Sequence, residues 1–339
     1  MSRRLRLPWA PFELFTYAAT LAVVGYLRWR GLRMDWRTIE FMAGPMFAQL
    51  PRALGIGLVL HAVALALARE SPRSWLRGVA TPVSALLWLR VWVATMTVTY
   101  TYSWLKVSVP LLRWEVLDPA LWKLDRFLHF GISPSIFAVE LVVGTPVAAW
   151  LERWYGLWLT SVVGMFAFAF LSPVLARRRN FALACAVLWI GGAALYFALP
   201  AVGPCYASED VFRELRAEMP SAAAAQARLW ENYVKLVAGR DGSLKQFNPY
   251  LGVAALPSLH VGAHVLFALW ARRHARRLFL PFAAAAALTF LASIATGWHY
   301  AVDGYLGALL AVAALWVAER FEPVPEDRPA ALAEAEPAA

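Results

Sequence analysis

Charge is scarce in this sequence of 339 residues. Only 16% of the residues are Asp, Glu, Lys or Arg, whereas 60% are hydrophobic, and a soluble domain would carry about a quarter charged residues. Cysteine is scarcer still: Cys185 and Cys205 are the only two, too few for a disulfide framework or a cysteine-based metal site. The composition therefore argues against a soluble domain and favours one polytopic membrane domain.

Long uncharged runs recur along the chain. Residues 154–176, 181–200 and 278–298 contain no Asp, Glu, Lys or Arg, and each run is long enough to cross about 30 Å of hydrocarbon as a helix. The runs do not alternate polar and apolar residues, which argues against a β-barrel. We therefore predict an all-α fold, a polytopic membrane helical bundle. The candidate spans are 8–27, 51–68, 79–105, 154–176, 181–200, 257–271, 278–298 and 303–318.

Basic residues gather in short clusters between the apolar runs. The net charge of +10 therefore indicates cytoplasmic loops rather than binding to nucleic acid. Segments 69–77, 177–179 and 272–277 are predicted to be cytoplasmic, and the charge-balanced segments 106–152 and 201–256 to lie on the outer side. Residues 112–130 have the pattern of an amphipathic segment on the outer surface. A bacterial inner membrane suits the composition.

Two histidines stand in apolar surroundings at the ends of neighbouring predicted helices. His260 lies near the outer end of the helix that begins at Pro257, and His299 lies just past the outer end of the next, antiparallel helix. Both imidazoles should therefore reach the same membrane face. Asp303 follows His299 by four residues, about one helical turn, so these two side chains can meet.

This trio has a chemical use. A carboxylate that binds one ring nitrogen fixes the imidazole tautomer and leaves the other nitrogen free to attack. A second, protonated histidine can give its proton to a leaving alkoxide. With a substrate phosphate between them, His299 would be the nucleophile, Asp303 its partner and His260 the general acid and then base. This chemistry requires no metal and no cofactor.

At these residues the sequence resembles the type-2 phosphatidic acid phosphatase superfamily, which carries P-S-[GL]-H and H-x-x-x-D motifs on adjacent helices. Here they are Pro257-Ser258-Leu259-His260 and His299-Tyr300-Ala301-Val302-Asp303. Leu259, the pair His299-Tyr300 and the segment "PAVGPCY" (200–206) resemble the branch of inositolphosphotransferases and inositol phosphorylceramide synthases. The resemblance implies a six-helix phosphatase-like core, here with about two extra N-terminal helices. The predicted parts are N-terminal membrane helices (1–78), a catalytic transmembrane domain (79–318) and a disordered cytoplasmic tail (319–339).

The usual phosphate ligands of that superfamily are missing. Ser293 stands where its members have an Arg six residues before the nucleophilic His, and no K-x6-R-P motif is found. Phosphate binding must therefore come from other groups. Lys245 is the first candidate, with Arg153, Lys235, Arg240 and the backbone N–H groups near Ser258 as others. The Ser258 side chain could equally cap its helix or touch phosphate.

The remaining polar residues in apolar runs have structural interpretations. His264 follows His260 by four residues, but Val261 replaces the Glu of a zinc helix, so packing is expected. His61 is expected to be structural and His129 interfacial. Arg90 is an intramembrane charge, for which we expect an ion pair with a carboxylate such as Glu13 or Glu140. The segment "KLDRFLHFG", with Asp125, resembles a recurrent outer segment of the superfamily, to which we assign no chemistry.

The function predicted from the sequence is a membrane phosphotransferase that moves an inositol-phosphate type of headgroup from a phospholipid to a lipid hydroxyl. The alternative is a lipid phosphate or diphosphate phosphatase in which water is the acceptor. Both use the same residues, so they remain open at this stage. A lipid or ion transporter would need charged or helix-breaking residues near mid-membrane, and the uncharged spans argue against it. A non-catalytic scaffold would make both histidines incidental.

Overall fold

The computed structural model describes residues 8–32, 36–69, 71–239 and 248–325, and every regular element within them is a helix. Five helices of this part are long and apolar enough to cross a membrane. They are the second part of α2 (Trp36–Ala68), α4 (Pro82–Leu112), α9 (Leu175–Ala198), α14 (Phe279–Ala295) with the 3-10 turn before it (Arg276–Leu278), and α15 (Ala301–Phe321). The predicted all-α, polytopic membrane bundle is confirmed.

Three more helices coincide with the other predicted spans. They are α1 (Pro11–Trp29), α8 (Trp158–Phe170) and α13 (Leu259–His274). One predicted boundary is displaced: the span expected to end at residue 105 continues through Lys106 and Pro110 to Leu112. This extension adds almost two turns of helix, which places Lys106 inside α4.

The bundle is built by helices that are far apart in the sequence. α13 packs between α14 and α15, α9 packs on α4 and α15, and α2 lies along α8. Buried aromatic rings fill the centre, where Phe181 of α9 meets Phe267 and Trp270 of α13. Close packing of this kind drives helix association in lipid, because the surrounding hydrocarbon is as apolar as the side chains.

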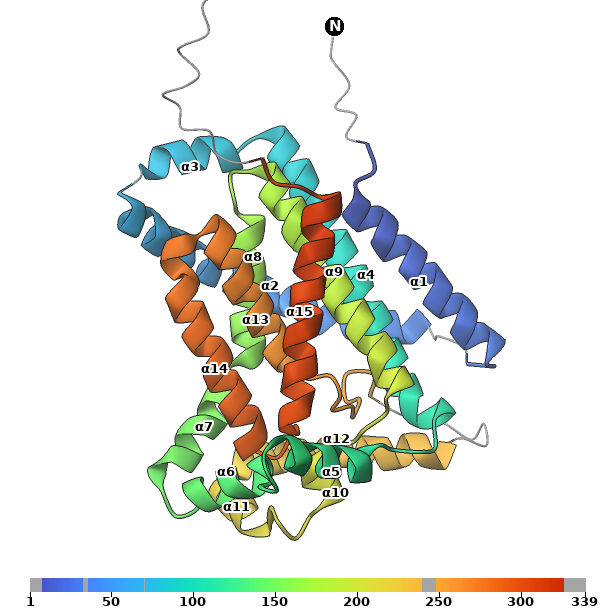
Figure 1. The fold of residues 1–339 in the computed structure, drawn as a ribbon. Helices are drawn as coiled ribbons and strands as arrows, with labels where there is room; N and C mark the ends of the chain where they lie inside the picture. The colour runs from blue at the N-terminus through green and yellow to red at the C-terminus, as the bar shows by residue number, and fades with distance from the viewer. Residues whose placement is uncertain (1–7, 33–35, 70, 240–247, 326–339) are drawn as a thin grey trace, which may run out of the picture.

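Short helices gather at one end of the bundle (Figure 1). They belong to the two segments predicted to lie outside, so each of these segments is folded across the bundle end. Most of them have Pro at the first or second helical position, where a missing N–H costs nothing. They are α5 (Asp118–Leu128), α6 (Pro134–Val142), α7 (Pro146–Gly156), α10 (Pro204–Ala207), α11 (Arg213–Glu218) and α12 (Pro220–Ala238).

The opposite end carries the three basic segments predicted to be cytoplasmic (Figure 1). There lie α3 (Pro72–Val79), the turn between α13 and α14, and the end of α15. α15 extends past the predicted domain boundary at residue 318 to Phe321, and the next carbonyl, of Glu322, accepts a hydrogen bond from Asn180 Nδ2 at 3.0 Å. Most of the predicted tail, residues 326–339, lies outside the described residues, and the three-part division remains a prediction.

Candidate active site

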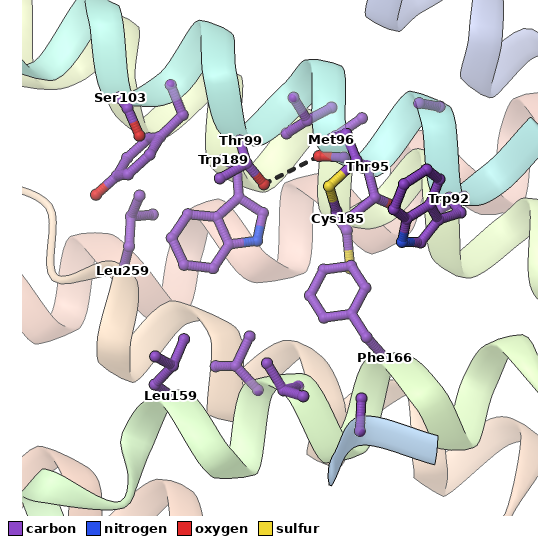
Figure 2. Close-up of a pocket in the computed structure, with 18 of the residues that line it drawn as sticks. Trp92, Thr95, Met96, Thr99, Ser103, Leu159, Phe166, Cys185, Trp189 and Leu259 are labelled. Carbon is purple, nitrogen blue, oxygen red and sulfur yellow. Dashed lines mark hydrogen bonds between the residues drawn. The ribbon is translucent and has the colours of Figure 1, made fainter. Parts of the chain in front are cut away.

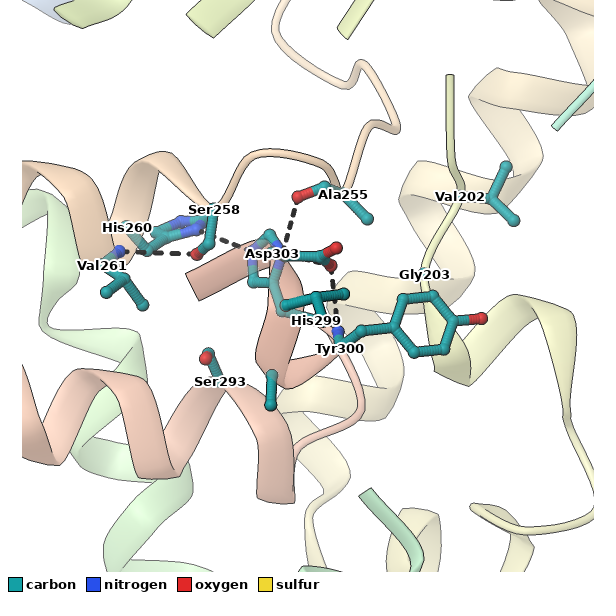
Figure 3. A network of polar contacts seen from close by, with 12 residues as sticks. Val202, Gly203, Ala255, Ser258, His260, Val261, Ser293, His299, Tyr300 and Asp303 are labelled. Atoms are coloured by element: carbon teal, nitrogen blue, oxygen red, sulfur yellow. Dashed lines mark hydrogen bonds and ion pairs between the residues drawn. The ribbon is translucent and has the colours of Figure 1, made fainter. Parts of the chain in front are cut away.

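The two sequence motifs meet (Figure 3), at the end of the bundle where the short helices gather (Figure 1). Ser258 caps α13 and places His260 in the first turn of that helix. Tyr300 caps α15, so His299 lies in the turn that joins α14 to α15. The Ser258 N–H donates to the Asp303 carbonyl oxygen at 2.8 Å. One backbone hydrogen bond thus ties the P-S-L-H segment directly to the H-x-x-x-D segment.

His299 is buried, with 4% of its surface exposed. Its Nδ1 lies 2.9 Å from the Ala255 carbonyl oxygen and 3.4 Å from Asp303 Oδ2. A carbonyl oxygen can only accept, so Nδ1 carries the proton and Nε2 has the free lone pair. The ring therefore presents Nε2 to the site, as a nucleophile requires.

Asp303 has a second task that the sequence did not suggest. Its Oδ2 accepts the Tyr300 N–H at 2.9 Å and so closes the first turn of α15. The carboxylate is fully buried and faces the His299 ring, although the nearer acceptor for Nδ1–H is the Ala255 carbonyl. Orientation of His299 is thus shared between a backbone carbonyl and the carboxylate.

His260 completes the cluster. Its Nδ1 lies 3.4 Å from His299 Nε2 and 2.9 Å from the hydroxyl of Tyr155, on α7. The ring systems of Trp158 and His260 pack edge to face, with centroids 4.4 Å apart. The three residues predicted as catalytic are therefore brought together, and Tyr155 is a fourth member that sequence reasoning missed.

The segment "PAVGPCY" is the scaffold of this site. Ala201 accepts the Ala255 N–H through its carbonyl, and the Cys205 N–H donates to the Gly297 carbonyl, both at 2.9 Å. Gly203 has a φ of +102°, and a Cβ there would lie 2.6 Å from the Trp298 carbonyl oxygen. The segment thus joins the residues that lead into α13 with the turn that carries His299, and at position 203 only glycine fits between them.

Two buried carboxylates of α5 hold the same region from outside. Asp118 accepts the N–H groups of Val202 and Gly203 at 2.9 and 2.8 Å. Asp125 accepts those of Ala301 and Val302, both at 3.0 Å, at the start of α15. Burial raises the pKa of Asp125, and the two N–H groups oppose that shift by stabilising the charged form.

Comparison with known proteins agrees with this geometry. A family model described as the PAP2 superfamily matches residues 119–317, more than half of the chain. The chain belongs to the PAP2 superfamily. The predicted type-2 phosphatidic acid phosphatase relationship is thereby confirmed, and PAP2 membership supports a function of the lipid phosphatase or phosphotransferase type. No curated protein and no solved structure matched the chain.

The predicted phosphate ligands occupy different places around this PAP2 site. Ser258 Oγ accepts the Val261 N–H at 3.4 Å, and its own N–H is used by Asp303, so this residue acts as a helix cap. Arg153 is exposed and two residues before Tyr155 on α7, which points it to another side of that helix. Lys235 is bound to Glu231. Lys245 and Arg240 lie outside the described residues.

Lys106 is a cation near the PAP2 histidines that sequence reasoning missed. It lines the same cavity as His260, and its Nζ lies 5.4 Å from the ring centroid of Tyr196. The described residues offer Lys106 no carboxylate within salt-bridge distance. The available signal was a lone cation in an apolar run, which suggests function when the run spans a membrane. The predicted span 79–105 ends one residue before Lys106, so the sequence did not mark this lysine as intramembrane.

The other polar residues have the structural contacts expected of them. Arg90 is ion-paired with Glu13, so the pair predicted between two helices is present. His264 Nε2 lies 2.8 Å from Ser161 Oγ, and His61 Nε2 lies 2.7 Å from the Phe168 carbonyl oxygen. Ser293 donates to the Phe290 carbonyl. In the described part of the chain, no group of three or more His, Cys, Asp or Glu side chains is placed to hold a metal ion.

Proposed function

We propose that this chain is an integral membrane phosphotransferase that moves an inositol-phosphate type of headgroup from a phospholipid to a lipid hydroxyl. The observation that carries the proposal is the meeting of His260 and His299, with Nδ1 and Nε2 3.4 Å apart. PAP2 membership supports phosphoryl chemistry on a lipid. The alternative is a lipid phosphate or diphosphate phosphatase with the same three residues.

The first step would form a phosphohistidine. His299 Nε2 attacks phosphorus, and the bond from phosphorus to the leaving lipid oxygen breaks. The protonated His260 gives its proton to that oxygen, so that a neutral alcohol departs. The positive charge that develops on His299 is stabilised by the Ala255 carbonyl and by the buried Asp303 carboxylate.

The second step would return both histidines to their starting states. His260 takes a proton from the acceptor hydroxyl, whose oxygen attacks phosphorus while the P–N bond to His299 breaks. A lipid alcohol gives a new phospholipid, and water gives the free phosphate ester. The burial of His299 and Asp303 beneath the short helices favours the transfer reaction, because an enclosed site limits the access of water.

The phosphate would lie near Lys106 rather than near an arginine on α14. Lys106 is the one charged side chain among the described residues that line the cavity at His260. The ammonium group of this half-buried lysine can neutralise a phosphate oxygen as a point charge. Substrate is a membrane phospholipid in this proposal, and the acceptor is a lipid hydroxyl.

We also propose that the site faces the outer side, the periplasm in a bacterial inner membrane. The support is the distribution of charge: the basic segments 69–77, 177–179 and 272–277 lie at the opposite end of the bundle from the histidines, whereas residues 28–37, which carry four arginines, leave the N-terminal topology open. Lys and Arg are enriched in cytoplasmic loops.

The experiment uses purified protein in detergent with headgroup-labelled phosphatidylinositol, with and without ceramide or diacylglycerol, beside His299→Ala. A labelled new phospholipid that needs both the acceptor and His299 supports transfer. Release of phosphoinositol regardless of acceptor supports the hydrolase alternative. Equal inactivity of wild type and His299→Ala on phosphatidylinositol, phosphatidic acid and prenyl diphosphate would contradict the catalytic assignment itself.

A further inference from the structure

An apolar cavity runs through the bundle beside the histidines. It encloses about 510 Å³ between α4, α8 and α9, with α2 along one side. This volume is within the range of small-molecule sites, roughly 300–1,000 Å³. Figure 2 shows its length, from Ser103 and Leu259 at one end to Trp92 and Phe166 at the other.

The two ends of the cavity differ in chemistry. Leu259 and His260 of the P-S-L-H motif line one end together with Lys106, the only charged lining residue in the described chain. Aromatic and aliphatic side chains line the rest, among them Trp92 and Phe166. A ligand that fits both ends must have an anionic or polar head and a hydrocarbon body.

The cavity is also long. Trp92 and Lys106 both line it, and the 14 helical steps of α4 from one to the other correspond to about 21 Å at 1.5 Å per residue. This is more than half of the roughly 30 Å of bilayer hydrocarbon. Because the walls are as apolar as lipid tails, a hydrocarbon chain can leave the bilayer for the cavity with little loss of solvation.

We propose that this cavity binds one hydrocarbon chain of the lipid phosphate substrate, with the phosphate held at the end formed by Lys106 and His260. The inference rests on the proposed function for the identity of the head. It adds that the lipid is bound inside the bundle, between α4, α8 and α9, rather than on the outer surface of the helices. Chain length and branching would then be read by the cavity walls.

The first test locates the chain without relying on turnover. Phosphatidic acid with a diazirine near the end of one acyl chain is photolysed with the wild-type protein in detergent, and the adducts are mapped by peptide mass spectrometry. Adducts at the far end of the cavity, on Trp92, Met96 or Phe166, are expected, and excess unlabelled lipid should suppress them. Adducts confined to the outward-facing Leu89 and Val93 of the same helix would overturn the proposal.

A matched pair of variants gives the control. Thr99 lines the cavity and Thr97 does not, although both donate to the carbonyl four residues earlier at 2.9 Å on α4. Thr99→Phe should abolish the adducts at Trp92, and Thr97→Phe should leave them. If Thr99→Phe does not fold, Ala186→Leu replaces it, with Ala194→Leu on the exposed side of α9 as its control.

Kinetics then separates the two proposals. Thr99→Phe should lower kcat/KM at least about tenfold on dioleoyl phosphatidic acid and less than about threefold on the dihexanoyl lipid, whose chains stop short of the block. Equal losses on both lipids, or none, would contradict binding of the chain in the cavity. Absence of any His299-dependent turnover of phosphatidylinositol and of phosphatidic acid would contradict the proposed function alone, because the cross-linking result still decides where the chain binds.

Discussion

The His299 ring has its reactive nitrogen selected by a backbone carbonyl. Ala255 accepts Nδ1–H at 2.9 Å, a shorter contact than the 3.4 Å to Asp303. The Ala255 carbonyl belongs to the segment that leads into α13, so the position of one catalytic histidine depends on the segment that carries the other. Asp303 adds a negative charge beside the ring and a cap for α15.

Tyr155 provides a prediction at the residue scale. Its hydroxyl lies 2.9 Å from His260 Nδ1, and one hydrogen bond of this kind contributes about 1 kcal/mol. Tyr155→Phe should therefore lower kcat about fivefold to tenfold, shift the pH profile of kcat, and leave Tm nearly unchanged. Tyr305→Phe is the control, because it removes a hydroxyl 2.9 Å from His129 Nε2, outside the catalytic pair. Equal effects of the two variants would argue against a role of Tyr155 in positioning His260.

At the scale of elements, α5 acts as a clamp on the catalytic turn. Asp125 caps α15 from outside, through the N–H groups of Ala301 and Val302. In Asp125→Asn, one of the two accepting oxygens becomes an NH2 group, so one of the two N–H groups loses its acceptor. We expect a loss of about 1–3 kcal/mol in stability and lower kcat, measured by thermal unfolding in detergent and by turnover. Asp210→Asn, which alters an exposed pair with Arg213, should change neither, and wild-type behaviour of Asp125→Asn would contradict the clamp.

The crossing of α13 and α15 depends on glycine. A Cβ on Gly307 would lie 2.2 Å from the Ser258 carbonyl oxygen, and Gly262 lies against the Gly307 carbonyl. Gly307→Ala should force the helices apart, move His260 away from His299, and lower both Tm and activity. Gly191→Ala is the matched control, because its Cβ would lie 3.5 Å from Leu310, an ordinary contact. That variant should keep or slightly raise Tm, since Ala is the better helix former; an intact Tm in Gly307→Ala would refute the close crossing.

At the scale of the whole molecule, the catalytic histidines and the arginine-rich turn between α13 and α14 are at opposite ends. The short helices cover the histidines at one end, and Arg272, Arg273, Arg276 and Arg277 lie at the other. The orientation we propose predicts a cytoplasmic end for α15. In bacterial expression, a fluorescent reporter fused after residue 339 should mature, and a periplasmic alkaline phosphatase reporter at the same point should be inactive. The reverse pattern would place the active site on the cytoplasmic face.

The sequence was informative where a side chain or an uncharged run carries the signal. The spans, the antiparallel pair of helices and the meeting of His260 with His299 all followed from spacing and helix geometry. Partners that are backbone groups were invisible: no residue type marks the Ala255 carbonyl, and Asp125 bonds N–H groups more than 170 residues away. Lys106 lies outside the predicted span for another reason: a charge ends that span at residue 105, whereas the helix continues to Leu112.

The central claim, that His299 carries the phosphoryl group, is tested most directly by trapping it. In His260→Ala, ³²P-labelled 4-nitrophenyl phosphate should still phosphorylate His299, because nitrophenolate leaves without a proton. The second step then lacks its base, so the phosphohistidine should persist. We predict one equivalent of nitrophenolate per protein and an alkali-stable, acid-labile label on the peptide that contains His299. Two results would contradict the account if the wild type turns over this ester. One is the absence of label in His260→Ala. The other is the same label in the double variant that also carries His299→Ala.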